Sequence, residues 1–202
     1  MRGKFITLEG IDGAGKSTHA PYVRDLVALR SGAGAVITRE PGGTPLGERL
    51  REMLLHETMM PDTEAMLMFA ARREHLERVI WPALDNGEWV ISDRFTDATI
   101  AYQGGGRGIA PARLAQLEAW THPGFQPDLT LLFDVPVEVG ATRVGHHRSL
   151  DKFEREARAF HERVRAAYLA RAAADSARFR IIDSTQPVAS VRAALERIVG
   201  TL

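Results

Sequence analysis

At residues 10–17 the chain reads Gly10-Ile11-Asp12-Gly13-Ala14-Gly15-Lys16-Ser17, which fits the pattern G-x-x-x-x-G-K-[ST] at every fixed position. An apolar run at 4–9 precedes it and predicts a buried strand, and a helical pattern over 16–31 follows. Glycines let such a loop turn its N–H groups toward phosphate oxygens, and the helix N-terminus adds a positive dipole. The sequence therefore predicts a nucleoside triphosphate site, with Lys16 reaching the β- and γ-phosphates and Ser17 ligating Mg²⁺.

Composition limits the class of protein. The chain has 202 residues, 45% hydrophobic and 26% charged, which predicts one ordinary globular domain spanning 1–202. Its 26 Lys and Arg residues balance 26 Asp and Glu residues, so net charge indicates neither a nucleic-acid nor a membrane partner. There is no cysteine, no apolar run near 18 residues and no signal-peptide pattern. We expect a cytoplasmic protein.

Strand and helix patterns alternate along the chain. Short runs rich in Val, Ile, Leu, Phe or Thr predict five strands, at 4–9, 35–38, 88–93, 129–134 and 179–183. Helical patterns lie near 16–31, 46–59, 62–84, 111–121, 136–144, 152–174 and 187–200. This order is typical of α/β proteins, in which helices cover both faces of a parallel sheet and ligands bind at the carboxyl ends of the strands.

Two arginines follow predicted strands. Arg39 opens R-E-P-G-G after the second strand, and Arg94 follows Asp93 at the end of the third. Because a guanidinium group matches two phosphate oxygens, Arg39 and Arg94 predict a site for an anionic acceptor. Asp93 is predicted to hold Mg²⁺, directly or through water. The guanine-reading sequence N-K-x-D of GTPases is absent from the chain, which favours a kinase.

The chain closely resembles the bacterial thymidylate kinases, members of the nucleoside monophosphate kinase group. The resemblance rests on the phosphate loop and on T-R-E-P-G-G-T at 38–44, F-A-A-R-R-E-H at 69–75, D-R-F-T-D-A-T-I-A-Y-Q-G-G-G-R-G at 93–108, P-D-L-T-L-L-F-D-V at 127–135 and I-D-S-T-Q-P at 182–187. It implies a P-loop nucleoside triphosphate hydrolase-like three-layer sandwich, with a five-stranded parallel sheet flanked by helices. The implied reaction is transfer of the γ-phosphoryl group of ATP to dTMP, giving dTDP and ADP for dTTP synthesis, with Mg²⁺ as cofactor and a homodimer as the assembly.

The resemblance also implies the residues that bind the acceptor. They are Asp12, Arg39, Phe69, Arg72, Arg94, Thr99, Tyr102 and Gln103. Asp12 would contact the 3′-hydroxyl of the sugar, and Tyr102 would crowd its 2′ position. Arg39 and Arg94 would clamp the phosphate. Thr99 and Gln103, four residues apart on a predicted helix, would meet the edge of the thymine.

The residue that covers the thymine is open between two neighbours. The family commonly has a Phe four residues before the base-reading Arg. Phe69 stands four before Arg73, but the neighbouring strings align better with Arg72, which puts Met68 at the covering position. We favour Arg72 as the base-reading residue and leave Met68 and Phe69 as alternatives, either of which also suits a core.

On the donor side, the resemblance implies that ATP is held by the phosphate loop, Thr18, Arg143, Thr185 and Gln186. Arg143 would stack on the adenine, with the loop at 184–186 opposite. A mobile lid is implied at about 145–154. Its catalytic cation is Arg148 or, in a gapless placement, His147. We favour Arg148, because Arg is fully charged at pH 7, with Lys152 as a helper. The implied catalytic residues are Lys16, Arg94, Arg148 and Asp12.

Two other functions are weighed against this one. A kinase for another phosphorylated acceptor would keep the reaction and change the pocket. A non-catalytic ATP-binding module would need fewer groups than the chain carries, since Asp93 and two acceptor arginines exceed what nucleotide binding requires.

Overall fold

A single parallel sheet organises the molecule. The computed structural model describes residues 2–144 and 151–202. Five strands pair in the order β2-β3-β1-β4-β5, all parallel. They are β1 (Phe5–Glu9), β2 (Ala35–Arg39), β3 (Trp89–Asp93), β4 (Leu129–Asp134) and β5 (Phe179–Asp183). Each lies within one residue of its predicted range, so the predicted five-stranded parallel sheet is confirmed.

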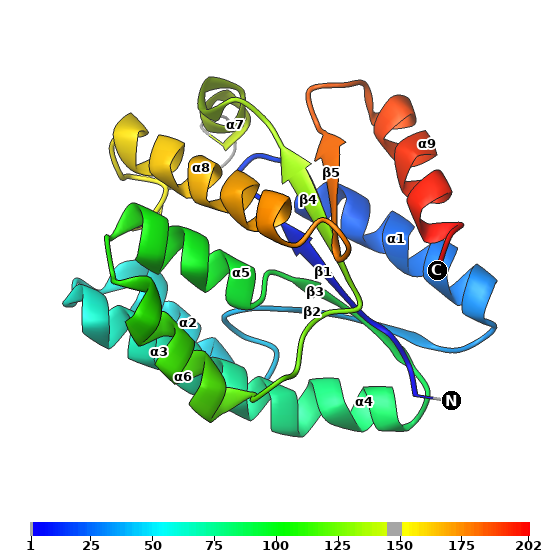
Figure 1. Ribbon diagram of the computed structural model, residues 1–202, viewed down its shortest axis with the longest axis horizontal. Helices are drawn as coiled ribbons and strands as arrows, with labels where there is room; N and C mark the ends of the chain where they lie inside the picture. The colour runs from blue at the N-terminus through cyan, green and yellow to red at the C-terminus, as the bar shows by residue number, and fades with distance from the viewer. Residues whose placement is uncertain (1, 145–150) are drawn as a thin grey trace.

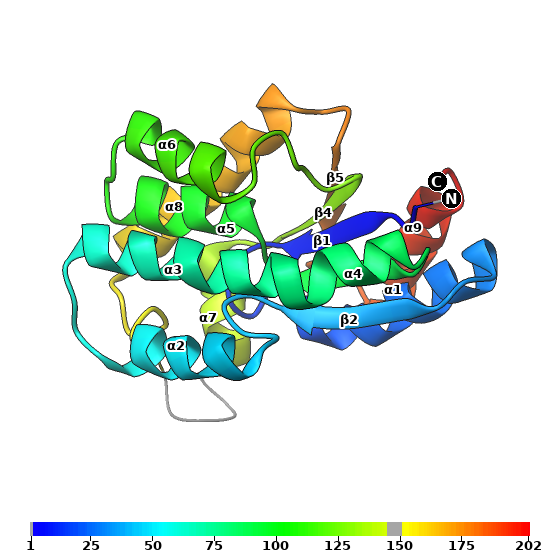
Figure 2. The same ribbon diagram turned by 90° about the horizontal axis from the view of Figure 1, so that it is seen from below.

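Helices cover both faces of the sheet and complete the three layers (Figure 1, Figure 2). One face carries α1 (Lys16–Ser31) and α9 (Val188–Val199), and the other carries α4 (Trp81–Asp85), α5 (Thr96–Thr99) and α8 (Arg158–Ala174). Beside the second layer, α2 (Pro45–His56), α3 (Pro61–His75) and α6 (Pro111–Thr121) pack against one another, and α7 (Val137–Val144) follows β4.

The central strand shows why the sheet is so apolar. Because β1 has a strand on each side and helices on both faces, all five of its residues are buried. Its apolar residues pack with those of β3 and β4, including Ile91 and Leu131. Glu9, the last residue of β1, is a carboxyl group with no exposed surface, and it lies directly before the phosphate loop.

Two helix predictions differ from the structure in detail. The pattern at 62–84 is one nearly continuous rod, in which a π-helical segment (Leu76–Ile80) joins α3 to α4. This wide turn immediately precedes Trp81 and Pro82, and proline has no N–H to continue an ordinary helical ladder. A second π-helical segment (Ile100–Gly106) extends α5, so the helix predicted to carry Thr99 and Gln103 changes from α to π between these two residues.

The predicted helix at 152–174 begins six residues later than expected, at Arg158. Residues 151–156 form a turn instead, because Oδ1 of Asp151 accepts hydrogen bonds from the N–H groups of Phe153 and Glu154, each at 2.9 Å. Phe153 is buried in the main core and anchors this turn. In the described part of the chain, none of the helices has the length and apolarity needed to span a membrane.

Candidate active site

One cavity of about 630 Å³ opens at the carboxyl ends of the strands. Most of the predicted site residues line it, namely Asp12, Gly13, Gly15, Lys16, Ser17, Thr18, Arg72, Asp93, Arg94, Thr99, Tyr102, Gln103, Arg143 and Gln186. The predicted residues Gly10, Ile11, Ala14, Arg39, Phe69 and Thr185 do not line it. Arg148 and His147 lie outside the described residues.

The phosphate loop adopts a conformation that only glycine accommodates at two positions. Gly10 has a φ of 134°, and a Cβ there would lie 2.3 Å from the carbonyl oxygen of Phe133. Gly13 has a φ of 76°, and its Cβ would lie 2.2 Å from the oxygen of Gly140. The loop is therefore packed closely against the end of β4 and against α7.

The Lys16 side chain folds back onto the phosphate loop and bonds to its backbone. Its Nζ donates to the carbonyl oxygens of Gly10 at 2.9 Å and Ile11 at 3.0 Å, and the residue is 5% exposed. Burial lowers the pKa of Lys16, and the positive charge of Arg94 adds to this effect. Asp93 and Asp12 oppose the shift, so the ammonium sits among carboxylates at the point where a triphosphate would replace the carbonyl contacts.

Arg94, Asp12 and Tyr102 form a compact hydrogen-bonded set. Nη2 of Arg94 donates to Oδ1 of Asp12 at 2.8 Å and to the Tyr102 hydroxyl oxygen at 3.0 Å. The Tyr102 hydroxyl donates to Oδ2 of Asp12 at 2.9 Å. Burial alone would raise the pKa of Asp12, but the Arg94 and Lys16 charges hold it well below its usual range. The set therefore presents an ionised carboxylate and a guanidinium side by side.

The backbone of Arg94 is left-handed, with a φ of 74°, and it is the one non-glycine residue with positive φ in the described chain. Neighbouring groups hold this conformation. The N–H of Arg94 donates to the Leu8 oxygen at 3.0 Å, and its carbonyl accepts from the Ser92 hydroxyl at 2.7 Å. The next N–H, of Phe95, donates to Oε1 of Glu9 at 2.8 Å. A strained backbone held on several sides is typical of a functional residue.

Ser17 and Asp93 meet as predicted. The Ser17 hydroxyl donates to Oδ2 of Asp93 at 3.2 Å. Oδ1 of Asp93 is buried and has no hydrogen-bond partner within the described residues. A buried carboxylate oxygen beside a hydroxyl is a donor set that suits Mg²⁺, so the residues present fit this ion.

The acceptor arginines are arranged differently from the prediction. Arg39 lies at the surface, where its Nη2 donates to Oε2 of Glu48 at 2.9 Å and its side chain is 55% exposed. Arg51, which the sequence reasoning missed, lines the cavity and donates to the Pro41 oxygen at 3.0 Å. Burial lowers the pKa of Arg51, and the charges of Arg39 and Arg94 lower it further, so the three guanidinium groups lie close enough to repel. A helical arginine carries no signal that separates Arg51 from its neighbour Arg49.

The base end of the cavity separates Met68 from Phe69. Met68 lines the cavity, whereas Phe69 is 3% exposed and packs in a second core with Ile109 and Leu114. Arg72 also lines the cavity, and its guanidinium carbon lies 4.8 Å from the centre of the Phe69 ring. The predicted contact of Phe69 with substrate is therefore not what the structure favours: Phe69 supports Arg72 from behind, and Met68 faces the cavity.

Thr99 and Gln103 lie on this wall as predicted. Oγ1 of Thr99 accepts from Nη2 of Arg72 at 2.9 Å. Nε2 of Gln103 donates to Oε1 of Glu64 at 2.9 Å, and Glu64 is itself buried. The carbonyl oxygen of Gln103 is the other polar atom of its amide, which fixes the side chain as an acceptor toward a ligand.

The donor end is built from the phosphate loop, α7 and the loop after β5. Arg143 donates to the Ser184 oxygen at 3.0 Å and to the Gly13 oxygen at 3.3 Å, which holds it on the cavity wall. Gln186 donates to Asp183 at 2.9 Å. Thr185 also donates to Asp183, but it does not line the cavity.

Lys152 does not have the surroundings of a catalytic helper. Its Nζ lies 2.8 Å from Oε2 of Glu64 and 3.2 Å from the Glu57 oxygen, to which it donates. The residue does not line the cavity. Lys152 therefore ties the turn at 151–156 to α3, and the predicted role beside the transferred phosphoryl group finds no support in this geometry.

Comparisons with known proteins agree with the site. A family model described as thymidylate kinase matches residues 8–195. A thymidylate kinase from Cupriavidus metallidurans is 63% identical over 202 residues, covering 100% of both chains, and one from Methylobacillus flagellatus is 60% identical over 194 residues, covering 95% of this chain and 94% of that protein. The crystal structure of thymidylate kinase from Ehrlichia chaffeensis matches with a TM-score of 0.80 and 31% identity, covering 98% of this chain and 99% of that one.

Proposed function

The chain belongs to the thymidylate kinase family, and from this premise we propose that its cavity transfers the γ-phosphoryl group of ATP to dTMP, giving dTDP and ADP. It is a phosphotransferase of nucleotide biosynthesis. The observation that carries the proposal for this cavity is the set of Arg94, Asp12 and Tyr102, held 2.8–3.0 Å apart beside the buried Lys16. A nucleotide that bound there would have its phosphate against a guanidinium group and its sugar against a carboxylate.

The acceptor end of the cavity suits thymidine monophosphate. Arg94 and Arg51 grip the phosphate, with Arg39 adding positive charge from the rim. Asp12 accepts a hydrogen bond from the 3′-hydroxyl, and the Tyr102 ring fills the space where a 2′-hydroxyl would lie. Deoxyribose is preferred for that reason.

The base is read at the other end of the same wall. Arg72 donates to a thymine carbonyl, and Gln103 offers its carbonyl oxygen to the N3–H of the base. Met68 covers one face of the ring. A cytosine would bring an amino group to Arg72 in place of a carbonyl, leaving donors opposed, and this mismatch is the source of selectivity.

The chemistry is mainly positioning and charge stabilisation. A phosphate oxygen of dTMP attacks the γ-phosphorus of ATP in line, and the bond to the β,γ-bridging oxygen breaks as ADP leaves. A monophosphate dianion is already nucleophilic, so no strong general base is needed. Lys16 leaves its carbonyl partners for the β- and γ-phosphates, while Arg94 holds the attacking group in line. Arg148, on the lid, is the cation proposed for the moving phosphoryl group.

Mg²⁺ is the proposed cofactor, held by Ser17 and Asp93. Bound there, the ion would neutralise charge on the β- and γ-phosphates. The buried Oδ1 of Asp93, which has no partner within the described residues, supports this assignment. At the donor end, Arg143 lies against the adenine, and Gln186 flanks it.

The deciding experiment measures ADP release with MgATP and, in turn, dTMP, dUMP, dCMP, dGMP and AMP. Strong turnover with dTMP and weaker turnover with dUMP is the expected result. Turnover confined to another nucleotide would keep the kinase and overturn the pocket assignment. ATP binding with no transfer to any of the five would contradict the catalytic role itself.

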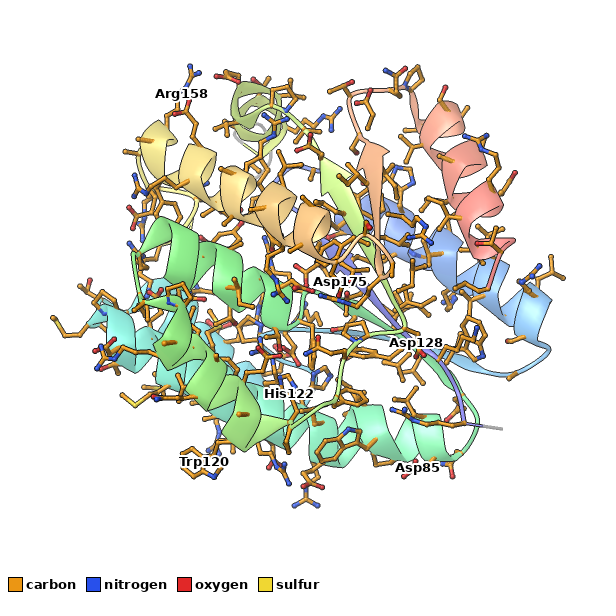
Figure 3. The ribbon with its side chains drawn as sticks, viewed as in Figure 1. Asp85, Trp120, His122, Asp128, Arg158 and Asp175 are labelled. Carbon is orange, nitrogen blue, oxygen red and sulfur yellow. The ribbon has the colours of Figure 1, made fainter. Side chains whose placement is uncertain are left out.

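We propose further that the protein is a cytoplasmic homodimer. Five apolar side chains support an interface because they are exposed on α2, α3, α6 and the α2–α3 connection; they are Leu46, Met53, Met60, Met66 and Trp120. Figure 3 shows Trp120 at the end of α6, pointing away from the molecule. We call these residues the apolar face. Exposed apolar side chains gathered on packed helices are typical of protein–protein contacts.

A further inference from the structure

Behind the base end of the cavity, four polar residues form a chain that is hidden from solvent. Arg72 is 2% exposed, Glu40 5%, His75 0% and Thr38 9%. They come from the end of β2, the residue after it, and the last turn of α3. We call Thr38, His75, Glu40 and Arg72 the buried polar chain. It lies directly against the cavity, because Glu40 and Arg72 both line it.

Each link of the chain is a short hydrogen bond. Nε of Arg72 donates to Oε2 of Glu40 at 2.7 Å, and Nδ1 of His75 lies 2.9 Å from Oε1 of the same carboxyl group. Nε2 of His75 lies 2.6 Å from the Thr38 hydroxyl. Burial would raise the pKa of Glu40, but the Arg72 charge and the His75 contact hold it below its usual value. An ionised carboxylate can only accept hydrogen bonds, so Nδ1 of His75 carries the hydrogen and donates a hydrogen bond to Glu40.

The guanidinium group of Arg72 is held from three directions, by Glu40 of the buried polar chain and by other residues around it. Glu40 takes Nε, Thr99 takes Nη2 at 2.9 Å, and the rings of Phe69 and Phe95 lie 4.8 and 5.1 Å from the guanidinium carbon. Nη1 is then left buried, without a hydrogen-bond partner among the described residues. An unsatisfied buried donor on a cavity wall is explained by a ligand atom that supplies the missing acceptor.

His75 matters to Arg72 through Glu40 alone. One carboxyl group shared by two donors has a fixed plane, whereas a carboxyl group held by Arg72 only can rotate and let the guanidinium turn with it. His75 and Arg72 are three residues apart on α3, so both point toward Glu40 from the same helix face. The space is also filled, since a Cβ on Gly43 would lie 2.6 Å from Nε2 of His75.

We propose that His75 is a positioning residue for base recognition. Through Glu40, it holds Arg72 so that Nη1 donates to a carbonyl oxygen of the acceptor base, and Thr38 keeps the imidazole ring in place. This inference rests on the proposed function, in which Arg72 reads thymine. Selectivity for the base then depends on a residue that never touches the substrate.

Two replacements of His75 test the proposal. His75→Asn keeps a donor where Nδ1 stands and loses the contact with Thr38, whereas His75→Leu loses both. For His75→Leu we expect KM for dTMP to rise roughly 10-fold while kcat stays within about 3-fold and KM for ATP is unchanged. For His75→Asn we expect most of the wild-type KM for dTMP to return. A purely structural role would lower kcat and affect both substrates.

The outcomes separate this inference from the function on which it rests. Arg72→Met should lose the preference for dTMP over dCMP; if it keeps that preference, the base-reading role of Arg72 fails. If Arg72→Met loses it while His75→Leu keeps a wild-type KM for dTMP, the positioning role of His75 fails alone. Equal losses in His75→Leu and His75→Asn would also overturn it, since the retained donor would then be irrelevant.

A milder variant covers the case in which His75→Leu does not fold. Thr38→Val removes one hydroxyl, conserves side-chain size and leaves every cavity contact in place. We expect it to raise KM for dTMP about 3-fold with KM for ATP unchanged. A wild-type KM for dTMP in Thr38→Val would contradict the part of the proposal that gives Thr38 a role.

Discussion

Arg94 has a backbone conformation that a side chain other than glycine rarely adopts. Its φ of 74° is maintained by hydrogen bonds to Leu8 and Ser92 and by the clamp of Glu9 on the next N–H. Strain of this kind costs on the order of 1–3 kcal/mol and persists where the surroundings fix it. With the backbone held in this conformation, the guanidinium group donates to Asp12 and to Tyr102.

We therefore expect Arg94→Ala to lower kcat/KM for dTMP by at least ~100-fold, which is about 2.7 kcal/mol of transition-state stabilisation. The reason is the loss of the one cation that contacts both Asp12 and Tyr102 in the described site. Steady-state kinetics with MgATP and dTMP measures the effect. Arg78→Ala is the matched control, because Arg78 is 72% exposed and pairs only with Glu74 among the described contacts. A nearly unchanged rate for Arg94→Ala would remove Arg94 from the site.

Met68 and Phe69 are neighbours with different surroundings, and substitution separates their roles. Met68→Ala removes a cavity-lining side chain, so we expect KM for dTMP to rise roughly 5-fold with a small change in Tm. Phe69→Leu leaves a buried position partly filled, so we expect a loss of about 1 kcal/mol in the free energy of unfolding, with a smaller change in KM. Thermal unfolding and steady-state kinetics on both variants give the comparison. The reverse pattern would restore Phe69 as the residue that covers the base.

At the level of elements, the carboxyl end of β1 joins three parts of the fold. Glu9 accepts from the Phe95 N–H after β3 and from the Tyr168 hydroxyl of α8, at 2.8 Å each, and it has no exposed surface. Burial raises the pKa of Glu9 to about 8, and the nearby Asp97 carboxylate contributes. The folded state therefore favours the protonated form of the Glu9 carboxyl group.

This shift predicts a loss of stability with rising pH. The folded state binds the Glu9 proton more tightly than the unfolded chain, whose ordinary pKa is 4.5. The resulting stabilisation is complete below pH 4.5 and is lost as pH rises to about 8, by roughly 1 kcal/mol per pH unit. Glu9→Gln keeps the shape without the proton, so its stability relative to wild type should increase across this range.

Urea unfolding at several pH values between about 5 and about 8 measures the difference in the free energy of unfolding between Glu9→Gln and the wild type. Glu57→Gln, at an exposed position, is the control and should run parallel to the wild type. If the Glu9→Gln and wild-type curves are also parallel, the Glu9 carboxyl group is not protonated in the folded protein.

The segment from Thr96 to Gly106 shows where element prediction from sequence stops. Five apolar runs were enough to predict the strands, because a buried parallel strand needs little else. The π-helical segment, by contrast, depends on tertiary contact. A Cβ on Gly106 would lie 2.4 Å from the Phe160 ring, and one on Gly105 would lie 2.6 Å from Ala167. These glycines let the segment approach α8, and no periodicity of the segment itself reveals its partner.

For the molecule as a whole, the family resemblance predicted the location of the cavity better than it predicted which individual side chains line it. The five parallel strands and a site at their carboxyl ends followed from alternation and from the matched strings. The exchange of Arg39 for Arg51 at the cavity did not, since it depends on the pairing of Arg39 with Glu48 of α2. The buried polar chain also escaped sequence reasoning, because it joins Glu40 to His75 across 35 residues.

The apolar face sets a prediction for the whole assembly. Trp120 is 85% exposed and Met66 53%, on helices that pack together beside the sheet. If these side chains are covered by a second copy, we expect the wild-type mass in solution to be twice the 22.3 kDa of one chain. Trp120→Glu combined with Met66→Glu should give the mass of a single chain, because burying two carboxylates in an apolar contact costs several kcal/mol. Sedimentation equilibrium measures both.

Leu29→Glu supplies the matched control for this test. Leu29 is 86% exposed, as apolar as the residues of the apolar face, but it lies on α1, which covers the opposite side of the sheet (Figure 1). The control should therefore keep the wild-type mass, which excludes a general effect of added charge. A wild-type mass of one chain would contradict the homodimer. A Leu29→Glu monomer beside an unaffected Trp120→Glu, Met66→Glu protein would move the interface to α1, because a carboxylate disrupts association only at the surface that a partner covers.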